Sequence, residues 1–255
     1  MKISVVTVCL NSADTIAYAL QSFLDQDYPH KELVVIDGVS ADETLSVVSR
    51  FASEAVTVIS EPDSGIYDAM NKGLAAFAGD AVGFLNADDR FADPGCLSAI
   101  AAGLAGADIV YGDVDFVVDH RSRRLVRRWR STDYCSGAFV RGWMPPHPTF
   151  YVRRAVVDAV GRFDTSFRIA ADYDYMLRAF ELHGFRSKRL DRMLVDMRHG
   201  GTSTGRLGAY LRSNIESHRS RRLRLGVAPW EVRALIAKPL RKLPQFLARS
   251  RAAVK

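Results

Sequence analysis

Short apolar runs alternate along the first ninety residues with segments in which apolar residues recur at helical spacing. The runs are rich in β-branched residues and have the length of buried strands, whereas the segments between them have the pattern of amphipathic helices. The predicted strands are residues 3–10, 32–38, 56–60 and 81–89, and the predicted helices are residues 11–26, 40–52 and 65–79. Because a helix follows each of the first three strands, the pattern predicts an α/β fold with a mainly parallel sheet and helices on both faces.

The first two predicted helices begin with residues that favour helix N-termini. The first predicted helix starts with the cap-type residues Asn11 and Ser12, and Ser40 and Glu43 have the spacing of a capping box at the second. The segment before the first helix has one lysine and a short β-branched core without a small-residue cleavage site. We therefore interpret it as a buried strand rather than a signal peptide.

The overall composition is that of an ordinary globular protein, with 255 residues, 48% of them hydrophobic and 25% charged. Three cysteines, Cys9, Cys96 and Cys135, are odd in number and widely spaced, which argues against a disulfide framework or a zinc site and favours a reducing compartment. The sequence contains no run of 18 or more apolar residues, so we expect no transmembrane helix.

Positive charge is concentrated at the end of the chain. Residues 206–255 hold thirteen Lys or Arg against two acidic residues, a balance of +11, so the remainder must carry about −5 if the whole chain is +6. These basic residues alternate with Leu, Trp, Ile and Phe, a mixture typical of a helical segment that lies on an anionic membrane surface, although nucleic acid attracts the same charge. We predict a globular domain over residues 1–205 and a basic amphipathic extension over residues 206–255.

Several carboxylates follow the predicted strands. Asp37 ends the second strand, Asp63 lies in the loop after the third, and Asp88 and Asp89 end the fourth. The carboxyl ends of parallel strands meet at one edge of a sheet, where ligands bind. Adjacent carboxylates repel each other, so Asp88 and Asp89 together predict a bound cation.

Five motifs occur in an order that resembles a known family. They are TVCLN, VVIDGVSADET, EPDSGIYDAMNKG, FLNADDR and AADYDYMLR. Over residues 2–205 the chain resembles the inverting nucleotide-sugar glycosyltransferases of family 2, which have the GT-A fold, and especially the bacterial members that build surface polysaccharides and glycolipids. The resemblance implies transfer of a sugar from a UDP or GDP donor to a glycan or a lipid-linked acceptor.

The resemblance also implies a metal site. The family usually has D-x-D where this chain has Asn86-Ala87-Asp88, so Asp88 is the expected ligand of Mg²⁺ or Mn²⁺, and Asn86 and Ala87 are expected beside the nucleotide sugar. Asp89 and His199 are expected to complete the metal shell. Hard carboxylate oxygens and substrate phosphates are the ligands that these cations prefer.

Further residues match the family's donor site. Asp37 is expected to bind the base, and its carboxylate accepts N–H groups of uracil and guanine alike. The segment from Thr7 to Asn11 is expected to wall the nucleoside. The residues expected near the donor sugar and the diphosphate share one helical face and are Asp68, Asn71 and Lys72. A solvated Asp68–Lys72 ion pair is the alternative for that face.

Asp172 matches the position of the family's catalytic base, which takes the proton of the acceptor hydroxyl. The alternative is a helix N-cap. Asp174 lies four residues before Arg178 and is expected to pair with it. His147, in a proline-rich loop, is a further candidate for contact with the acceptor or the sugar, with an incidental loop position as the alternative.

Two other kinds of protein share some of these features. A nucleic-acid-binding protein would account for the basic extension, but the sequence lacks recognition motifs of that class, and we expect no nucleic acid partner. A sugar nucleotidyltransferase would share the carboxylates, but residues 7–15 contain no glycine-rich phosphate loop. Arginines crowd residues 121–130, which we predict to be a hairpin strand. We expect a cytoplasmic protein that is peripheral on the inner face of the plasma membrane.

Overall fold

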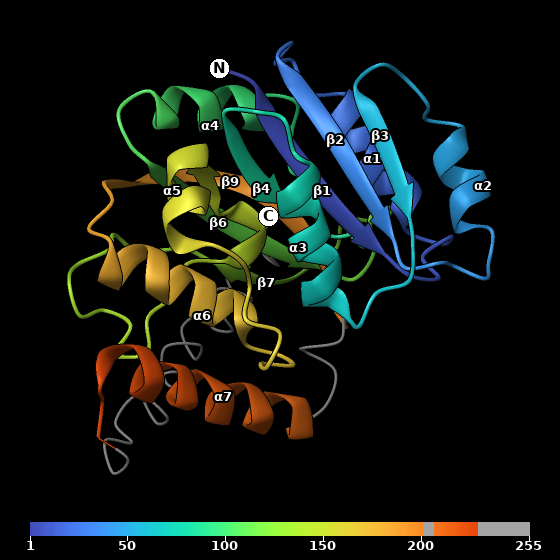
Figure 1. Ribbon diagram of the computed structural model, residues 1–255. Coiled ribbons are helices and arrows are strands. Elements are labelled where there is room, and N and C mark those ends of the chain that lie inside the picture. The colour runs from blue at the N-terminus through green and yellow to red at the C-terminus, as the bar shows by residue number, and fades with distance from the viewer. Residues whose placement is uncertain (201–206, 229–255) are drawn as a thin grey trace.

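The structure, a computed structural model, describes residues 1–200 and 207–228. Its first half contains four parallel strands in the spatial order β3-β2-β1-β4 (Figure 1). The strands are β1 (Ile3–Cys9), β2 (Lys31–Asp37), β3 (Val56–Ser60) and β4 (Ala81–Phe84), and the connecting helices are α1 (Ile16–Leu24), α2 (Thr44–Ser49) and α3 (Ile66–Ala76). The predicted α/β fold with a parallel section is confirmed.

The alternation of side chains along the buried strands creates two hydrophobic cores. In β1, Val6 and Val8 face the core that includes Met70 of α3, whereas Ile3 and Val5 face the core on the other side of the sheet. Every residue of β1 is buried, including the polar Ser4 and Thr7, so the strand is covered on both faces of the sheet. The carboxyl ends of β1 and β4 are therefore held at fixed positions.

The second half of the chain makes the sheet mixed. Strand β8 is antiparallel to both β4 and β6, β9 is parallel to β6, and β5 and β7 add antiparallel edges to β9 and β6. These strands are β5 (Asp89–Phe91), β6 (Ile109–Val117), β7 (Leu125–Trp129), β8 (Tyr151–Arg153) and β9 (Ser187–Arg198). The remaining helices are α4 (Cys96–Leu104), α5 (Arg154–Val160), α6 (Ala171–Leu177) and α7 (Leu207–Leu225), with a 3₁₀ turn at His147–Thr149 and a π turn at Arg178–Leu182.

Two local predictions were wrong. The fourth strand ends at Phe84, and the chain turns before Asp89 begins β5, so the paired carboxylates lie in and just after a turn rather than at a strand end. No capping box forms at α2, because Glu43 is the N-cap without a side-chain bond and the Ser40 hydroxyl donates to Asp37 instead. The demand of a buried carboxylate for donors outweighs the helix cap there.

The predicted hairpin strand is confirmed as β7, paired with β6. Its arginines are partly used within the fold: the Arg127 guanidinium carbon lies 3.8 Å from the centroid of the Phe116 ring, and Arg128 pairs with Asp115 at 2.7 Å. Burial lowers the pKa of Arg127 to about 10.

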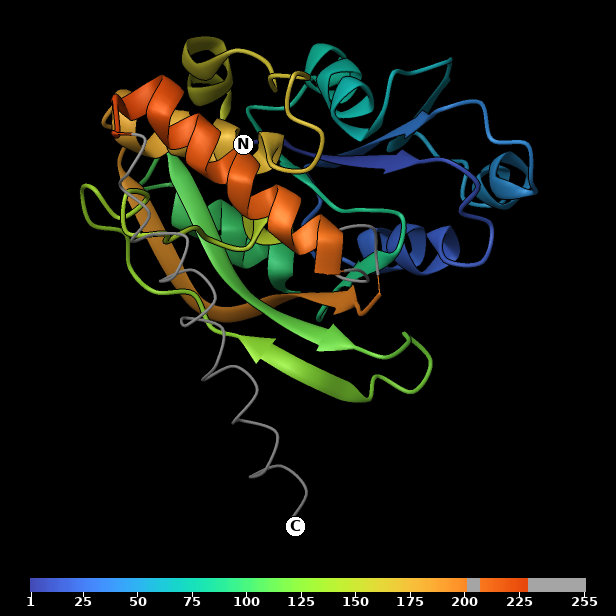
Figure 2. The same ribbon diagram turned by 90° about the horizontal axis from the view of Figure 1, so that it is seen from below.

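Helix α7 packs against α6 and lies in front of α6 when the molecule is viewed from below (Figure 2). Although the sequence assigns α7 to the basic extension, Ser217, Ser220 and Arg221 on its inner side are fully or almost fully buried. The part of the extension that the structure describes is thus packed on the body, and the rest of it, residues 229–255, lies outside the described residues. Within residues 1–200 and 207–228, no helix has the length and apolar character of a transmembrane span.

Candidate active site

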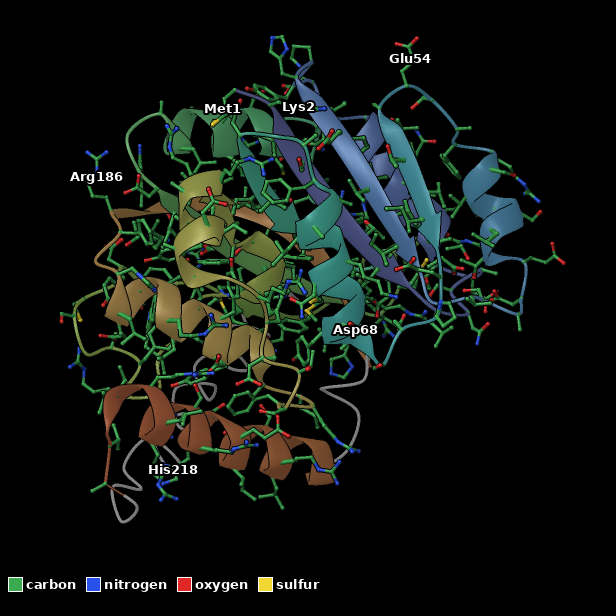
Figure 3. All side chains as sticks on the ribbon, viewed as in Figure 1. Met1, Lys2, Glu54, Asp68, Arg186 and His218 are labelled. Atoms are coloured by element: carbon green, nitrogen blue, oxygen red, sulfur yellow. The ribbon has the colours of Figure 1, made fainter. Side chains whose placement is uncertain are left out.

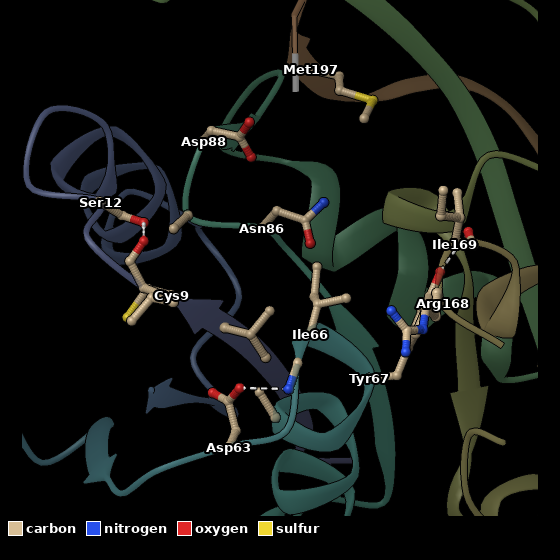
Figure 4. A pocket seen from close by; sticks show the side chains of 15 residues that line it. Cys9, Ser12, Asp63, Ile66, Tyr67, Asn86, Asp88, Arg168, Ile169 and Met197 are labelled. Atoms are coloured by element: carbon tan, nitrogen blue, oxygen red, sulfur yellow. Dashed lines mark hydrogen bonds between the residues drawn. The ribbon is translucent and has the colours of Figure 1, made fainter. Parts of the chain in front are cut away.

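A pocket of about 540 Å³ lies at the carboxyl ends of β1 and β4 (Figure 4). One wall comes from the end of β1 and the start of α3, and another from the turn after β4. A third comes from the loop before α6 and the end of β9. The labelled residues that line it are Cys9, Ser12, Asp63, Ile66, Tyr67, Asn86, Asp88, Arg168, Ile169 and Met197. The edge of the sheet at which we expected ligands therefore contains the pocket.

Asp63 shapes the entry to α3. Its Oδ1 accepts the Gly65 N–H at 2.8 Å, and Gly65 has a φ of 124°, which favours glycine. A Cβ on Gly38 would lie 2.4 Å from the Asp63 Oδ2, so the loop after β2 needs glycine to approach this carboxylate. The loop after β2 and the loop after β3 therefore lie close together at the wall of the pocket, where Gly38 approaches Asp63.

Asp88 and Asn86 face the pocket, whereas Asp89 lies behind them. The Asn86 Nδ2 donates to Asp89 at 3.0 Å, and Asp89 also accepts the Arg198 N–H at 3.3 Å. Asp89 is fully buried. Of the three residues expected at the metal, only Asp88 lines the pocket. His199 is exposed beyond the end of β9, and its backbone N–H donates to the Val117 carbonyl at 2.8 Å.

The electrostatics of this turn suit a cation. Burial raises the pKa of Asp88 and that of Asp89, and the charge of Asp88 raises the latter further. The Asn86 Oδ1 is buried and lacks a hydrogen-bond partner among the described residues. A group of three or more acidic, His or Cys side chains arranged to hold a metal does not occur in the described part of the chain. A divalent ion here would thus bind the Asp88 carboxylate and the Asn86 Oδ1 and take its other ligands from substrate phosphate and water.

His120 supports the Asp88 turn and was not found from the sequence. Its Nε2 donates to the Asp88 carbonyl at 2.7 Å, and its ring packs 5.4 Å from that of Tyr18. Burial lowers the pKa of His120, which keeps the ring neutral. The turn between Asp119 and Ser122 gives no periodic signal that could have identified this contact.

Asp172 lies at the start of α6 and is half-buried. Its Oδ1 accepts the Tyr173 N–H at 2.8 Å and lies 3.3 Å from the Tyr67 hydroxyl, which also donates to the Ile169 carbonyl at 2.7 Å. Since Tyr67 and Ile169 line the pocket, Asp172 lies at its edge, one tyrosine away. The N-cap alternative is wrong, because Ala170 is the N-cap of α6.

Helix α7 holds the start of α6 in place. The Glu216 Oε2 accepts the N–H groups of Ile169 at 2.9 Å and Ala170 at 3.0 Å, and so satisfies donors that α6 leaves without a side-chain cap. The predicted Asp174–Arg178 pair is confirmed at 2.9 Å. Asp174 is fully buried and also pairs with Arg224 of α7 at 3.0 Å.

Of the residues expected to bind the nucleoside, Asp37 and Asn11 are bonded to other parts of the protein, whereas the buried Thr7 hydroxyl lacks a hydrogen-bond partner among the described residues. Asp37 is fully buried and accepts the Ser60 hydroxyl at 2.7 Å and the Ser40 N–H at 3.1 Å. Burial alone would raise the pKa of Asp37, but these hydrogen bonds outweigh it and hold the pKa below its usual value. Thr7 is also fully buried, while its neighbours along β1 line the pocket. The exposed Asn11 accepts the Ala41 N–H at 2.8 Å. Their roles in nucleoside binding stay predictions.

The face of α3 that carries Asp68, Asn71 and Lys72 is divided among several contacts. Asp68, at the beginning of α3 (Figure 3), accepts the Ser64 N–H at 2.9 Å, and Lys72 pairs with Glu61 at 3.2 Å rather than with Asp68. Asn71 makes two bonds with the Phe163 backbone, at 2.8 and 3.0 Å, and so fixes the loop that leads to α6. None of the three lines the pocket.

Arg168 and Tyr67 are pocket residues that the sequence analysis missed. Arg168 is exposed and is the one Lys or Arg among the described residues that line the pocket. Its position four residues before Asp172 was an available signal, because the two side chains flank the start of one helix. Tyr67 lies in the EPDSGIYDAMNKG motif, but an aromatic residue in a helix suggests packing and gives no sign of the hydrogen bonds that its hydroxyl makes.

His147 packs beneath the pocket rather than in it. Its ring stacks on that of Phe84, with centroids 5.6 Å apart, and its Nε2 is buried without a hydrogen-bond partner among the described residues. Burial lowers the pKa of His147 below the usual 6.5, although the charge of Asp172 opposes the shift. Contact of this ring with acceptor or sugar stays a prediction.

The buried His147 should make stability depend on pH. The unfolded chain binds the imidazole proton more readily than the folded protein, so this contribution to the free energy of unfolding is complete above the usual pKa of 6.5 and is lost as the pH falls below it. Between pH 7.5 and 5.5, the wild type should lose more stability than His147→Gln. Urea unfolding of both proteins at both pH values measures this difference. The contribution of His120 is the same in the wild type and in the variant, so it cancels. Equal losses would contradict the prediction.

Comparisons with known proteins identify the family of the chain. The model of the family described as Glycosyl transferase family 2 matches residues 4–171. A PGL/p-HBAD biosynthesis glycosyltransferase of Mycobacterium tuberculosis is 33% identical over 184 residues, which is 69% of each chain. The succinoglycan biosynthesis protein ExoO of Rhizobium meliloti is 30% identical over 199 residues, covering 71% of this chain and 56% of ExoO.

Solved structures share the fold. A crystal structure of S. aureus TarS in complex with UDP matches with a TM-score of 0.65 at 21% identity, covering 100% of this chain and 73% of TarS. The mannosyltransferase PcManGT from Pyrobaculum calidifontis, in complex with GDP-Man and Mn²⁺, matches with a TM-score of 0.65 at 23% identity, covering 100% of this chain and 76% of its own. The predicted GT-A fold is confirmed.

Proposed function

Because the chain belongs to glycosyl transferase family 2, we propose that it moves a sugar from a UDP or GDP donor to an acceptor hydroxyl with inversion at the anomeric carbon. The observation that carries this proposal is the pocket itself, which has the Asp88 carboxylate on one wall and Tyr67, the partner of Asp172, on another. The first suits a divalent cation that would bridge to the diphosphate, and the second suits a proton transfer.

Asp172 acts as the general base. It takes the proton of the acceptor hydroxyl as the oxygen attacks the anomeric carbon from the face opposite the diphosphate. The Tyr67 hydroxyl, 3.3 Å from the Asp172 Oδ1, and the Tyr173 N–H fix the carboxylate orientation. The clamp from Glu216 keeps the beginning of α6 from moving during the reaction.

The turn after β4 holds the diphosphate end of the donor. Asp88 and the Asn86 Oδ1 are the groups that would bind Mg²⁺ or Mn²⁺, and the ion supplies positive charge that stabilises the departing diphosphate. Participation of Asp89 and His199 is part of the proposal, although Asp89 would need to turn from its present partners. His120 keeps the turn in place through the Asp88 carbonyl.

Arg168 contributes a second positive charge on the pocket wall. Charge-assisted hydrogen bonds to phosphate contribute about 1.5–3 kcal/mol. Arg168→Gln should therefore raise the KM for the donor by about tenfold to a hundredfold with a smaller change in kcat, because the contact exists before and during transfer. Steady-state kinetics with the donor varied measures the split. The exposed Arg141 offers a matched control, and a change confined to kcat in Arg168→Gln would contradict the role.

The relatives support the choice of acceptor. Two of them are described by their part in PGL/p-HBAD and succinoglycan biosynthesis, which suggests a glycan or lipid-linked acceptor for this chain also. The neighbours bind UDP and GDP-Man, so both nucleotides are retained in the proposal. We place the protein at the cytoplasmic face of the plasma membrane as a peripheral protein.

A thermal-shift panel with UDP, GDP, dTDP and CMP sugars, with and without Mn²⁺, tests the proposal. We expect a UDP or GDP sugar to raise the melting temperature, more strongly with Mn²⁺, because a ligand that binds the folded state stabilises it. Incubation of that donor with a lipid-linked glycan should then release the nucleoside diphosphate. Absence of stabilisation by every sugar nucleotide would refute the assignment.

A further inference from the structure

One side of α7 presents aliphatic and cationic side chains to the outside. Leu211, Ile215 and Leu223 are 55%, 66% and 57% exposed, which is unusual for large aliphatic residues. Three arginines lie at the same side, because residues spaced by three, four and seven positions share a helix face. We name this surface the outer face of α7, and it comprises Leu211, Arg212, Ile215, Arg219, Arg222 and Leu223.

The charge of the outer face is positive without a compensating acid on the helix. Glu216 is the one acidic residue of α7, and it turns inward to accept the N–H groups of Ile169 and Ala170. Arg224 also turns inward, toward Asp164 and Asp174. The inner side of the helix is therefore satisfied by the body. Arg219 also contacts the body, because it donates to the Ser166 carbonyl and hydroxyl at 3.4 Å and lies over the Phe167 ring. Arg212 and Arg222 are thus the cations that the outer face presents together with its aliphatic side chains.

Helix α7, which carries the outer face, reaches the pocket wall through Glu216. The Glu216 side chain accepts the Ile169 N–H at 2.9 Å, and Ile169 lines the pocket. Figures 1 and 2 show α7 at the edge of the molecule, on the outer side of α6. A large surface that contacts the outer face would thus come close to the edge at which Asp172 lies.

We infer that the outer face of α7 is a docking surface for an anionic lipid bilayer, with Leu211 and Ile215 entering the boundary between headgroups and acyl chains. Arg212 and Arg222 flank these aliphatic residues at the level of the lipid phosphates. The inference rests on the proposed function and deepens it, because it makes the acceptor a membrane-borne molecule. The charge of the face selects the anionic leaflet.

The aliphatic residues favour a bilayer over nucleic acid as the partner. Nucleic acid is bound through phosphate contacts and aromatic stacking, for which exposed Leu and Ile offer nothing. A bilayer uses both properties, since apolar side chains give affinity that salt does not screen and arginines give affinity that salt weakens.

Sedimentation of the full chain with vesicles tests the inference. The vesicles contain either equal amounts of phosphatidylglycerol and phosphatidylcholine or phosphatidylcholine alone. Leu211→Gln/Ile215→Gln and Arg212→Gln/Arg222→Gln should each lower the partition coefficient on the mixed vesicles by about tenfold or more. A matched control, Leu45→Gln/Val58→Gln, changes exposed aliphatic residues of α2 and β3 and should bind as the wild type does.

Other occupants of the face have distinct results. Unchanged partition in both test variants would overturn the inference, as would equal binding of the wild type to both kinds of vesicle. A dimer that dissociates in Leu211→Gln/Ile215→Gln, as measured by light scattering, would overturn it in favour of a second copy. Salt-sensitive DNA binding that disappears in Arg212→Gln/Arg222→Gln, with vesicle binding intact, would overturn it in favour of nucleic acid.

The same variants separate this inference from the proposed function. Donor-induced thermal shifts in solution should be equal in the wild type and in Leu211→Gln/Ile215→Gln, because neither residue lines the pocket. Donor shifts combined with unchanged partition would refute the docking surface alone. Partition that falls as expected in a protein that binds no sugar nucleotide would refute the proposed transfer while the docking surface stands.

Discussion

Asp172→Asn is expected to reduce glycosyl transfer by about a hundredfold to ten-thousandfold, the usual contribution of a positioned general base. The amide keeps the size of the side chain and can still contact Tyr67 and the Tyr173 N–H, but it cannot take the proton of the acceptor hydroxyl. Donor binding should change little, because Asp172 lies at the edge of the pocket and does not line it. Measurements of kcat and of the donor dissociation constant check both parts.

The control for this experiment is Asp158→Asn, which removes an exposed carboxylate from α5 and should leave turnover unchanged. A variant of Asp172 that keeps more than half of the wild-type kcat would contradict the assignment. A variant that instead loses donor binding and melts earlier would show that the carboxylate serves the fold of α6 rather than the reaction.

Asp88→Ala is expected to abolish the effect of Mn²⁺ on donor binding. The variant removes the one carboxylate of the FLNADDR motif that faces the pocket, leaving the Asn86 Oδ1 as the remaining ligand candidate that lines it. Turnover should fall by about a hundredfold or more, since charge stabilisation by a metal contributes several kcal/mol. Thermal shifts with UDP and GDP sugars, recorded with and without Mn²⁺, measure the binding part directly.

Asp191→Asn, which removes a highly exposed carboxylate of β9, is a suitable control for nonspecific ion binding. If Mn²⁺ strengthens donor binding as much in Asp88→Ala as in the wild type, the ion lies elsewhere or is not needed. The backbone contact of His120 with residue 88 does not depend on its side chain, so we expect the fold of the turn to persist in the variant.

The parallel half of the fold could be predicted from the sequence because its signals are local. A β-branched run such as residues 3–10 must be buried on both faces, and the helical segments between the runs leave few topologies. The predicted end of the fourth strand was wrong because local signals do not mark where an apolar run leaves the sheet. Nothing local distinguishes Phe84, the last strand residue, from the apolar Leu85 that follows it.

The candidate site was found only where chemistry leaves a mark on the sequence. Two adjacent carboxylates after an apolar run mark Asp88, whereas Asp172 is marked by its match to the position of the family's catalytic base. The bonds of Asn71 to Phe163, and those of Asp37 to Ser40 and Ser60, depend on segments that the fold brings together, so these side chains looked free. His120 and Tyr67 were missed because each contributes one polar atom, the imidazole Nε2 and the phenol hydroxyl, on a side chain whose ring otherwise packs in the fold.

The clamp between α7 and α6 also decides where this chain can be shortened. A protein that ends at residue 205 would lack Arg224 and Glu216, so Asp174 would remain buried with one cation fewer and the Ile169 and Ala170 N–H groups would lose their acceptor. Asp174 would keep Arg178 but lose Arg224 and the Ser220 hydroxyl, and a buried carboxylate that loses partners is destabilising, so such a fragment should be less stable and less active for reasons unrelated to localisation. Variants intended to separate membrane attachment from turnover should therefore retain α7 and change single side chains on its solvent side.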